Sequence, residues 1–376
     1  MSAIDKIIDV KSVIITCGAG GVGKTTIAAA IGCYAAKKGR KVAVLTVDPA
    51  RRLASSLGLD SFEENSEPIK IPTKDGFVTM DAMMLDNSST FDRLVKKYAP
   101  NEEQAKTILA NKFYRHFSGS VGGTHEYTAM ERLYELSNMG KWDLLIMDTP
   151  PTVHALDFLD APQRMIDLFD ESIFKWVIKP YLAAGKVGVQ VLSFGSAYIF
   201  KTLTKFVGGE MLQDLSEFLF LFQDLFEGFK SRAVDVQKLL HDDKTGFLIV
   251  ATAQINSLKE ASLFKRELFR MNLPFTGFVI NRYFRLLDKC EDKNYVLKKL
   301  LENSGRSKEE CEAFAERLFT AQEKYQSASM QQRETLSTFR NKMTKNPDTF
   351  SVPLFNRDVA DIDSLIRVAE SLAVEK

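Results

Sequence analysis

The sequence has few cysteines and histidines and almost no net charge. Its 376 residues include four cysteines and four histidines, and the cysteines are scattered without C-x-x-C spacing. This pattern argues against a disulfide framework and against a zinc site. The formal net charge of +1 gives no general reason to expect nucleic acid or an anionic membrane surface as a partner. We therefore expect no nucleic-acid partner.

Long hydrophobic runs are also missing. No uncharged stretch is longer than residues 187–200, which fall short of the roughly 18 apolar residues that a spanning helix needs. The first residues lack the basic-then-apolar pattern of a signal peptide. We therefore expect no stable membrane insertion and a cytoplasmic location. With 45% apolar residues, the chain can bury one large α/β core and an appended subdomain.

The most informative feature that is present is a glycine-rich loop. Residues 18–25 read G-A-G-G-V-G-K-T, with a β-type apolar run at 12–17 before them and a helix-compatible run at 26–38 after them. This context is typical of a phosphate loop, in which backbone N–H groups converge on phosphate oxygens. Lys24 is expected to reach the β- and γ-phosphates, and the Thr25 hydroxyl to hold Mg²⁺. The other expected nucleotide contacts in the loop are Gly18, Gly20, Gly21, Val22, Gly23 and Thr26.

Further apolar runs predict the fold class. They lie at 42–47, 143–147, 247–252 and 276–280, and helix-compatible segments separate them. Nearly continuous Val, Ile and Leu is typical of buried parallel strands, so we predict an α/β fold with a doubly wound, mostly parallel sheet. Asp48, Asp148 and Asn281 end or directly follow three of these runs. Since ligands collect at the carboxyl ends of such strands, we expect all three to face the same crevice as the phosphate loop.

Between residues 148 and 247 the chain leaves this pattern for a stretch too long for an ordinary connection. Apolar residues follow helical spacing over 211–229, and residues 165–207 are rich in large apolar side chains. We therefore predict an inserted α-helical subdomain. Either its helices pack against one another and against residues 91–136, or they form an apolar groove that accepts a hydrophobic helix from a client protein. The sequence leaves both explanations open.

Five ordered segments resemble those of one known family. They read GAGGVGKTT at 18–26, VDPA at 47–50, MDTPPTVHALDFL at 147–159, VIN at 279–281 and VPLFNRDV at 352–359. They are similar to segments of the ArsA-like ATPases, P-loop NTPases with a deviant Walker A motif. That family includes the arsenite-pump ATPase and the factor that targets tail-anchored membrane proteins. The resemblance implies a dimeric, Mg²⁺-dependent ATPase in which nucleotide state opens and closes the dimer and remodels a surface of the helical insert.

The resemblance also implies roles for individual residues. Asp48 would act with Lys24 in catalysis by orienting the attacking water, and Asp148 would bind Mg²⁺ through water. The adenine of ATP would be received by Asn281 and by the 353–357 loop, with Pro353 and Phe355. The chemistry agrees, because γ-phosphate hydrolysis needs positioning more than a strong base. An aspartate with a pKa of about 3.9 aligns water better than it deprotonates it.

One position departs from the family pattern. Ala19 stands where the family usually carries a second lysine, which reaches the partner's nucleotide. Such trans-acting cations contribute roughly 10³- to 10⁵-fold in rate in related enzymes. Three readings stay open: a heterodimer with a paralogous ATPase that retains the lysine, instead of a homodimer; compensation by Arg51 or Arg52; or a slow switch. The alternative function is therefore a low-activity, ATP-binding regulatory subunit of a heteromeric complex.

On these grounds we expect five segments along the chain. They are a first part of the ATPase core at 1–90, a helical segment packing with the insert at 91–140, a core strand and second switch at 141–155, an apolar helical insert at 156–240, and the second part of the core at 241–376. The last of these includes a helical excursion at about 286–345. The insert is the expected client or interaction subdomain.

Overall fold

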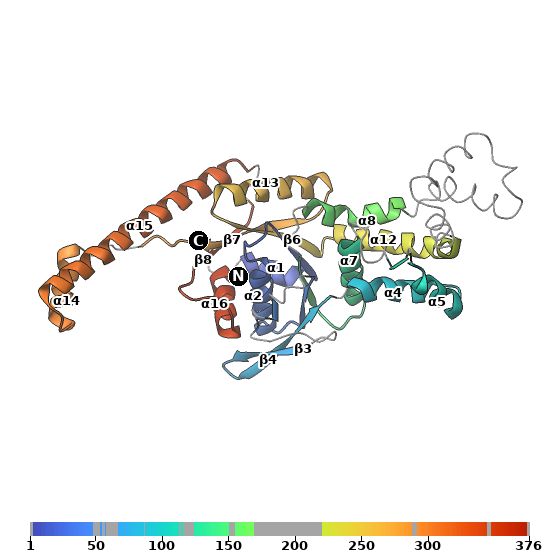
Figure 1. Cartoon of the computed structure of the whole chain (residues 1–376), viewed down its shortest axis with the longest axis horizontal. Helices are drawn as coiled ribbons and strands as arrows, with labels where there is room; N and C mark the ends of the chain where they lie inside the picture. Colours follow the sequence, from blue (N-terminus) through green and yellow to red (C-terminus); the bar gives the residue numbers. More distant parts are fainter. Residues whose placement is uncertain are drawn as a thin grey trace, which may run out of the picture.

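The computed structural model describes residues 3–47, 53–54, 57, 67–85, 87–112, 114–115, 124–149, 155–168, 220–287, 292–343 and 347–373. At its centre lies an eight-stranded sheet in the order β3-β4-β2-β5-β1-β6-β7-β8 (Figure 1). The strands are β1 Val13–Cys17, β2 Val42–Thr46, β3 Glu67–Thr73, β4 Gly76–Met84, β5 Leu144–Asp148, β6 Thr245–Thr252, β7 Phe275–Tyr283 and β8 Thr349–Pro353.

All neighbouring strands pair in parallel except β3, which forms an antiparallel edge hairpin with β4. The predicted α/β class with a mostly parallel sheet is therefore confirmed. The apolar runs that predicted strands correspond to β1, β2, β5, β6 and β7. The three central strands β1, β2 and β5 are buried along their whole length, as expected for strands covered on both faces.

The helices that the structure describes cover both faces of the sheet and extend beyond both ends of it. They are α1 Ala3–Val10, α2 Lys24–Lys37, α4 Asn87–Tyr98, α5 Glu102–Ala110, α7 Thr124–Ser137, α8 Ala155–Leu168, α12 Phe226–His241, α13 Ile255–Arg270, α14 Lys293–Asn303, α15 Lys308–Asn341 and α16 Ile362–Ala373, with a short 3₁₀ turn η2 at Gln223–Leu225. Among them, none is both long and apolar enough to cross a membrane.

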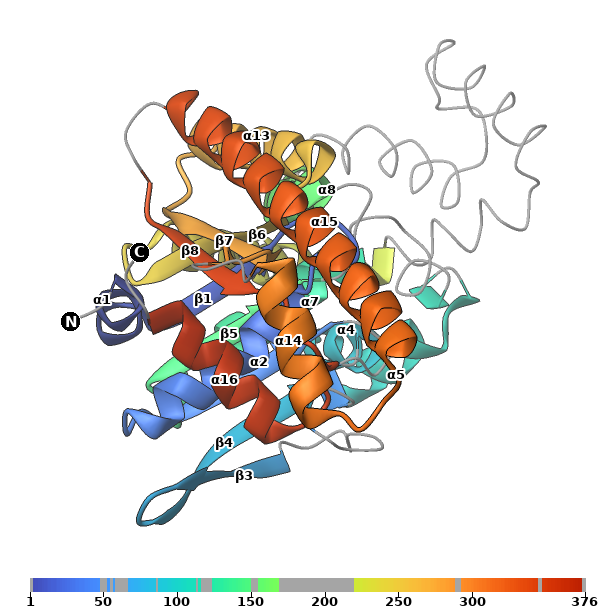
Figure 2. The same cartoon turned by 90° about the vertical axis from the view of Figure 1, so that its left-hand side faces the viewer.

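Two apolar cores lie on opposite faces of the sheet. Alternate residues of β1 point to each: Ile14 belongs to the core under α1, α2 and α16, whereas Ile15 belongs to the core under α7, α8, α12 and α13. Helices α2 and α16 lie side by side on the first face (Figure 2). Since successive side chains of a strand point to opposite faces of the sheet, the sheet separates the two cores.

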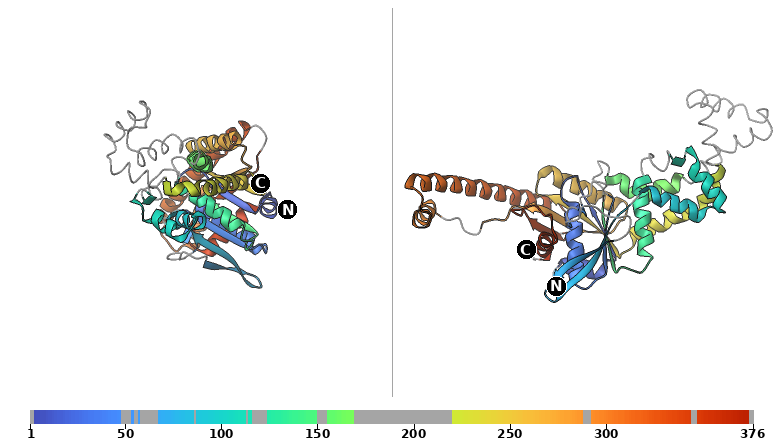
Figure 3. Two further views of the ribbon diagram at one scale, coloured as in Figure 1. Left: turned by 90° about the vertical axis from the view of Figure 1, so that its right-hand side faces the viewer. Right: turned by 60° about the horizontal axis from the view of Figure 1, so that its bottom comes forward.

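Two helical groups lie on opposite sides of the molecule. Helices α4, α5, α7, α8 and α12 contact one another in the first group, whose helices α7, α8 and α12 also cover one face of the sheet, and the paired helices α14 and α15 extend away on the other side (Figure 3). The second group lies where the sequence predicts a helical excursion. Most of the predicted apolar insert, residues 169–219, lies outside the described residues, and the division of the chain into segments stays a prediction.

In the described part of the first group, aromatic residues of the predicted insert are buried against the 91–136 segment. Phe222 and Phe229 are fully buried. The ring of Phe229 stacks on Phe91 with centroids 6.0 Å apart and lies 6.0 Å from the ring of Tyr98. Part of the apolar surface of the 211–229 pattern is therefore covered within the chain, in line with the first of the two explanations for it.

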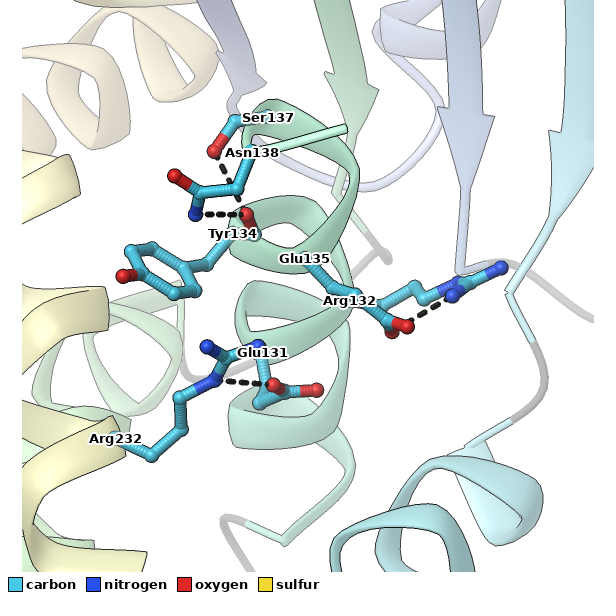
Figure 4. Close-up of polar contacts among 7 residues, drawn as sticks. All are labelled: Glu131, Arg132, Tyr134, Glu135, Ser137, Asn138 and Arg232. Carbon is cyan, nitrogen blue, oxygen red and sulfur yellow. Dashed lines mark hydrogen bonds and ion pairs between the residues drawn. The ribbon is translucent and has the colours of Figure 1, made fainter. Parts of the chain in front are cut away.

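A buried ion pair joins α7 to α12 in this group. Arg232 Nε lies 2.6 Å from Glu131 Oε1, and the two side chains are 13% and 3% exposed (Figure 4). The Arg232 guanidinium also lies over the ring of Tyr134, 4.3 Å from its centroid. Both charges are thus paired where water is excluded, which is the condition under which buried charges are tolerated.

Candidate nucleotide-binding site

The phosphate loop connects β1 to α2 at the carboxyl end of the central strand, where the sequence predicts it. Gly18 has a φ of +144°, and a Cβ there would lie 2.2 Å from the carbonyl oxygen of Val250. Gly23, with a φ of +93°, would bring a Cβ 2.3 Å from Asn281 Nδ2. A Cβ at Gly18 would meet the main chain of the neighbouring strand β6 and one at Gly23 the end of the Asn281 side chain, and the positive φ disfavours a side chain at both positions.

Lys24 is the first residue of α2 and lies folded over the loop. Its side chain is largely buried, with 5% of the residue exposed. The ammonium Nζ donates hydrogen bonds of 3.0 Å to the carbonyl oxygens of Gly18 and Ala19. The positive charge is therefore held at the loop itself, beside the N-terminus of α2. This combination favours an anion such as a phosphate group.

Thr25 and Asp148 lie together at the same edge of the sheet. The Thr25 hydroxyl donates to Asp148 Oδ2 at 2.7 Å, and the Thr46 hydroxyl donates to the same oxygen at 3.2 Å. Asp148, the last residue of β5, is 1% exposed. The structure thus brings together the two residues predicted for Mg²⁺, which lie 123 positions apart in sequence.

The chemistry of this donor pair fits Mg²⁺. A hydroxyl and a carboxylate supply oxygen ligands, and Mg²⁺ in nucleotide sites usually binds one or two protein oxygens together with substrate phosphates and waters. Within the described ranges, no three His, Cys, Asp or Glu side chains are grouped in a way that could hold a metal alone. The pair therefore suits a metal that arrives with a nucleotide better than a closed protein cage.

Asn281 makes a contact that sequence reasoning missed. It ends the buried part of β7 and is 7% exposed. Its Nδ2 donates to the carbonyl oxygen of Val22 at 2.8 Å, while its Oδ1 accepts from the backbone N–H of Arg282 at 2.9 Å. The side chain therefore braces the phosphate loop against β7. The predicted contact of Asn281 with adenine stays a prediction.

A cavity of about 450 Å³ opens beside the phosphate loop. It is lined by Ala19, Gly20, Gly21, Val22, Thr252, Gln254, Asn256, Ser257, Glu260, Arg282, Phe284, Gln332 and Leu354. These residues come from the loop, from the ends of β6 and β7, from the first turns of α13, from α15 and from the segment after β8. The sequence predicted the loop side of this cavity and missed the other walls, because helices from distant parts of the chain form them.

The predicted adenine loop lies at the edge of this cavity. Leu354 lines it and is 46% exposed, and its backbone N–H donates to the Tyr283 carbonyl at 3.0 Å. The neighbouring predicted residues are placed differently: Pro353 is buried at the end of β8, and Phe355 packs against the core under α2 and α16. The side chain of this segment that reaches the cavity is therefore the one between the two predicted residues, and the adenine contact of the segment stays a prediction.

Other predicted residues lie outside the described part of the chain. These are Asp48, the predicted catalytic residue, and Arg51 and Arg52, the two candidates for compensating charge. Thr26 lies in the first turn of α2. Of the predicted crevice, the structure therefore describes the side formed by Lys24, Thr25, Asp148 and Asn281.

Comparison with known proteins identifies the family. The family model described as "Anion-transporting ATPase" matches residues 11–345, most of the chain. The chain belongs to the anion-transporting ATPase family. It is similar to proteins named ATPase GET3 from Malassezia globosa and ATPase ASNA1 homolog 2 from Paramecium tetraurelia. The first is 26% identical over 282 residues, 74% of this chain and 75% of the relative. The second is 28% identical over 284 residues, 73% and 76% of the two chains.

A third relative, ATPase get3 from Aspergillus terreus, is 25% identical over 293 residues, covering 76% of this chain and 78% of the relative. These matches confirm the resemblance found in the sequence. They show that the chain is an ATP-binding ATPase, in agreement with its phosphate loop. Its activity is therefore hydrolysis of the γ-phosphate of ATP.

Proposed function

We propose that this ATPase is a Mg²⁺-dependent nucleotide switch that works as a dimer and binds a hydrophobic protein segment on its helical insert. The observation that carries the proposal is the contact between Thr25 and Asp148, because it joins the phosphate loop to the strand that leads into the insert. Helix α8 begins seven positions after Asp148 and packs against α7, α12 and α13. A change at the γ-phosphate would therefore act on the strand end directly before the helical group.

In the proposed reaction the chain's own residues position the nucleotide. The loop N–H groups and Lys24 hold the phosphates, and Thr25 and Asp148 hold Mg²⁺, which neutralises charge on the phosphate oxygens when it is bound. Asp48 orients the attacking water. Asn281 keeps the loop in place through Val22. This assignment agrees with the need of γ-phosphate transfer for alignment and charge neutralisation.

The hydrophobic client is supported by the apolar helical pattern of the insert and by the resemblance to the ATPases that target tail-anchored proteins. At the edge of the insert, Phe220 is 45% exposed, whereas Phe222 is buried. Apolar surface beyond what the fold covers is typical of a protein-binding face. A cytoplasmic location stays a prediction from the sequence.

The second candidate is a low-activity regulatory subunit that pairs with a lysine-bearing paralogue. One observation favours it: the side chain at position 19, which lines the cavity at the loop, is a methyl group. A homodimer would then lack, at this position, the cation that the family uses in trans. The charge would come either from Arg51 or Arg52 or, in a heterodimer, from the lysine of the paralogue.

The deciding experiment is steady-state ATPase activity of the purified chain across a Mg²⁺ titration, with molar mass from light scattering in ATP. Turnover that is lost in Asp48→Asn, a raised Mg²⁺ requirement in Asp148→Asn and a doubled mass in ATP would support the switch. ATP binding without turnover, with activity gained in Ala19→Lys, would favour the regulatory subunit. A molar mass that stays that of a monomer in ATP, whether or not the chain hydrolyses ATP, would contradict dimerisation.

A further inference from the structure

The end of β7 contains an irregularity that points a charged side chain toward the phosphate loop. Ile280 pairs with Ser351 and Tyr283 with Pro353, so β7 uses one residue more than β8 between the two pairs. Within this bulge, Arg282 has a φ of +56°. A left-handed conformation is unfavourable for a residue with a side chain. Bulges beside functional sites commonly redirect a side chain.

The direction of Arg282 follows from its contacts. Its backbone N–H donates to Asn281 Oδ1 at 2.9 Å, which stabilises the turn, and its Nη1 donates to the carbonyl oxygen of Gly21 at 3.4 Å. The second contact is long, and Arg282 is an exposed residue. The guanidinium therefore lies next to the loop, on an exposed residue that lines the cavity.

The positive charge of Arg282 is distinctive among the residues that line the cavity. Of the described residues that line it, Arg282 is the cation and Glu260 the carboxylate, while Ala19 offers only a methyl group. The remaining polar groups include Gln254, the N-cap residue of α13, and Ser257. Arginine binds phosphate oxygens through two parallel hydrogen bonds, which is a geometry that lysine cannot supply.

We propose that Arg282 is a phosphate-binding residue of the nucleotide site, which holds the polyphosphate from the cavity side of the loop. The inference rests on the proposed nucleotide site at Lys24 and adds to it a second cation. The bulge and the left-handed backbone of Arg282 bring the guanidinium to the loop.

The test is equilibrium binding of Mg²⁺–ATP and of inorganic triphosphate to the full chain by calorimetry. A charge-assisted contact of about 1.5–3 kcal/mol corresponds to about a 10- to 100-fold change in Kd. Arg282→Ala is expected to weaken both ligands by such a factor and to reduce the dependence of log Kd on log salt concentration. Arg282→Lys is expected to recover part of the loss.

Arg285→Ala is the matched control, because Arg285 is also exposed and does not line the cavity. It is expected to leave both Kd values within about twofold, as ordinary surface changes do. Unchanged triphosphate binding in Arg282→Ala, with ATP weakened, would overturn the proposal, since the contact would then be to the nucleoside. Equal losses in Arg282→Ala and Arg285→Ala would overturn it too, as would a loss accompanied by a lower melting temperature of the nucleotide-free protein.

Lys24→Ala separates this inference from the proposed site. If wild type binds ATP, Lys24→Ala abolishes binding and Arg282→Ala matches wild type, the nucleotide site stands and the role of Arg282 fails. If Lys24→Ala binds ATP like wild type, the proposed site itself fails, and the inference fails with it.

Discussion

At the scale of single residues, the phosphate loop depends on close approach between backbones. The Cα of Gly18 faces the carbonyl of Val250 on the neighbouring strand β6, and Gly21, in the same loop, faces open space. Both have positive φ values, +144° and +77°. Both positions therefore have a positive φ that disfavours any residue with a Cβ, and they differ in the room available for that Cβ, which makes them a matched pair.

Gly18→Ala is expected to lower the free energy of unfolding by about 3 kcal/mol or more, because the added Cβ collides with a main-chain oxygen and the φ is unfavourable. Gly21→Ala is expected to lower it by only about 1–2 kcal/mol, the cost of the left-handed backbone. Urea denaturation of the two variants measures the difference. Equal losses would show that the approach of Val250 is relieved by small shifts.

Two buried thiols, on β1 and on α2, are expected to be chemically inert. Cys17 ends β1 directly before the loop, and Cys33 lies on α2; burial raises the pKa of each to about 12. For Cys17 the charge of Lys24 opposes this shift and is outweighed. Since the thiolate is the reactive species, only a minute fraction of either residue is ionised at pH 8.

Iodoacetamide at pH 8 should therefore label neither Cys17 nor Cys33 in the folded protein, and both should react after denaturation in urea. Peptide mass spectrometry before and after denaturation gives the answer residue by residue. Rapid native labelling of Cys17 would mean that the end of β1 opens to solvent.

At the scale of elements, the ion pair between Glu131 and Arg232 is the polar link between α7 and α12. The Arg232 and Glu131 side chains are 13% and 3% exposed, and Arg232 also contacts the ring of Tyr134. Removing one partner leaves the other charge largely buried without its hydrogen-bonded partner. The exposed pair of Lys238 and Asp235 on α12, 72% and 35% exposed, is a natural comparison because water and salt screen it.

We expect Glu131→Ala and Arg232→Ala each to cost about 3–5 kcal/mol of stability. The double variant should cost clearly less than the sum of the two, because it removes both charges. Asp235→Ala should change stability by less than about 1 kcal/mol. Chemical denaturation supplies the four values of the cycle, and additive single effects would contradict coupling between the two helices.

At the scale of the whole molecule, one sheet separates two cores. Ile14 and Ile15 are adjacent on β1, are 1% and 0% exposed, and belong to the cores on opposite faces. Helix α2 after the phosphate loop covers one face, and the helical group next to Asp148 covers the other. The nucleotide site therefore lies on the sheet that separates the two cores.

Ile14→Ala and Ile15→Ala are each expected to cost about 2–5 kcal/mol through lost burial and the cavity that remains. Because both residues pack on one strand, each should shift the same cooperative transition. Far-UV and near-UV circular dichroism during urea unfolding should therefore give coincident midpoints in both variants. A second transition that responds to only one substitution would show that the two faces unfold separately.

The buried strands could be predicted from the sequence because both of their faces are covered, so each reads as an unbroken apolar run. The hairpin of β3 and β4 was missed for the opposite reason: β4 lies in an edge hairpin, and its first residues are exposed. Strand β8 is short and ends in a proline, so no apolar run marks it. The residues of the site were predictable where a local motif carries them, as in Gly18 to Thr25.

The sequence by itself determined the family, the mostly parallel α/β fold and the position of the phosphate loop. These depend on local chemistry: glycines that allow the loop to bend, and apolar runs that must be buried. Only the tertiary structure decided that Asn281 braces the loop at Val22, that Asp148 meets Thr25, and that Arg282 points to Gly21. Each of these contacts joins the phosphate loop or the start of α2 to the end of another strand, so its existence depends on strand order and, for Arg282, on a bulge, which no local pattern encodes.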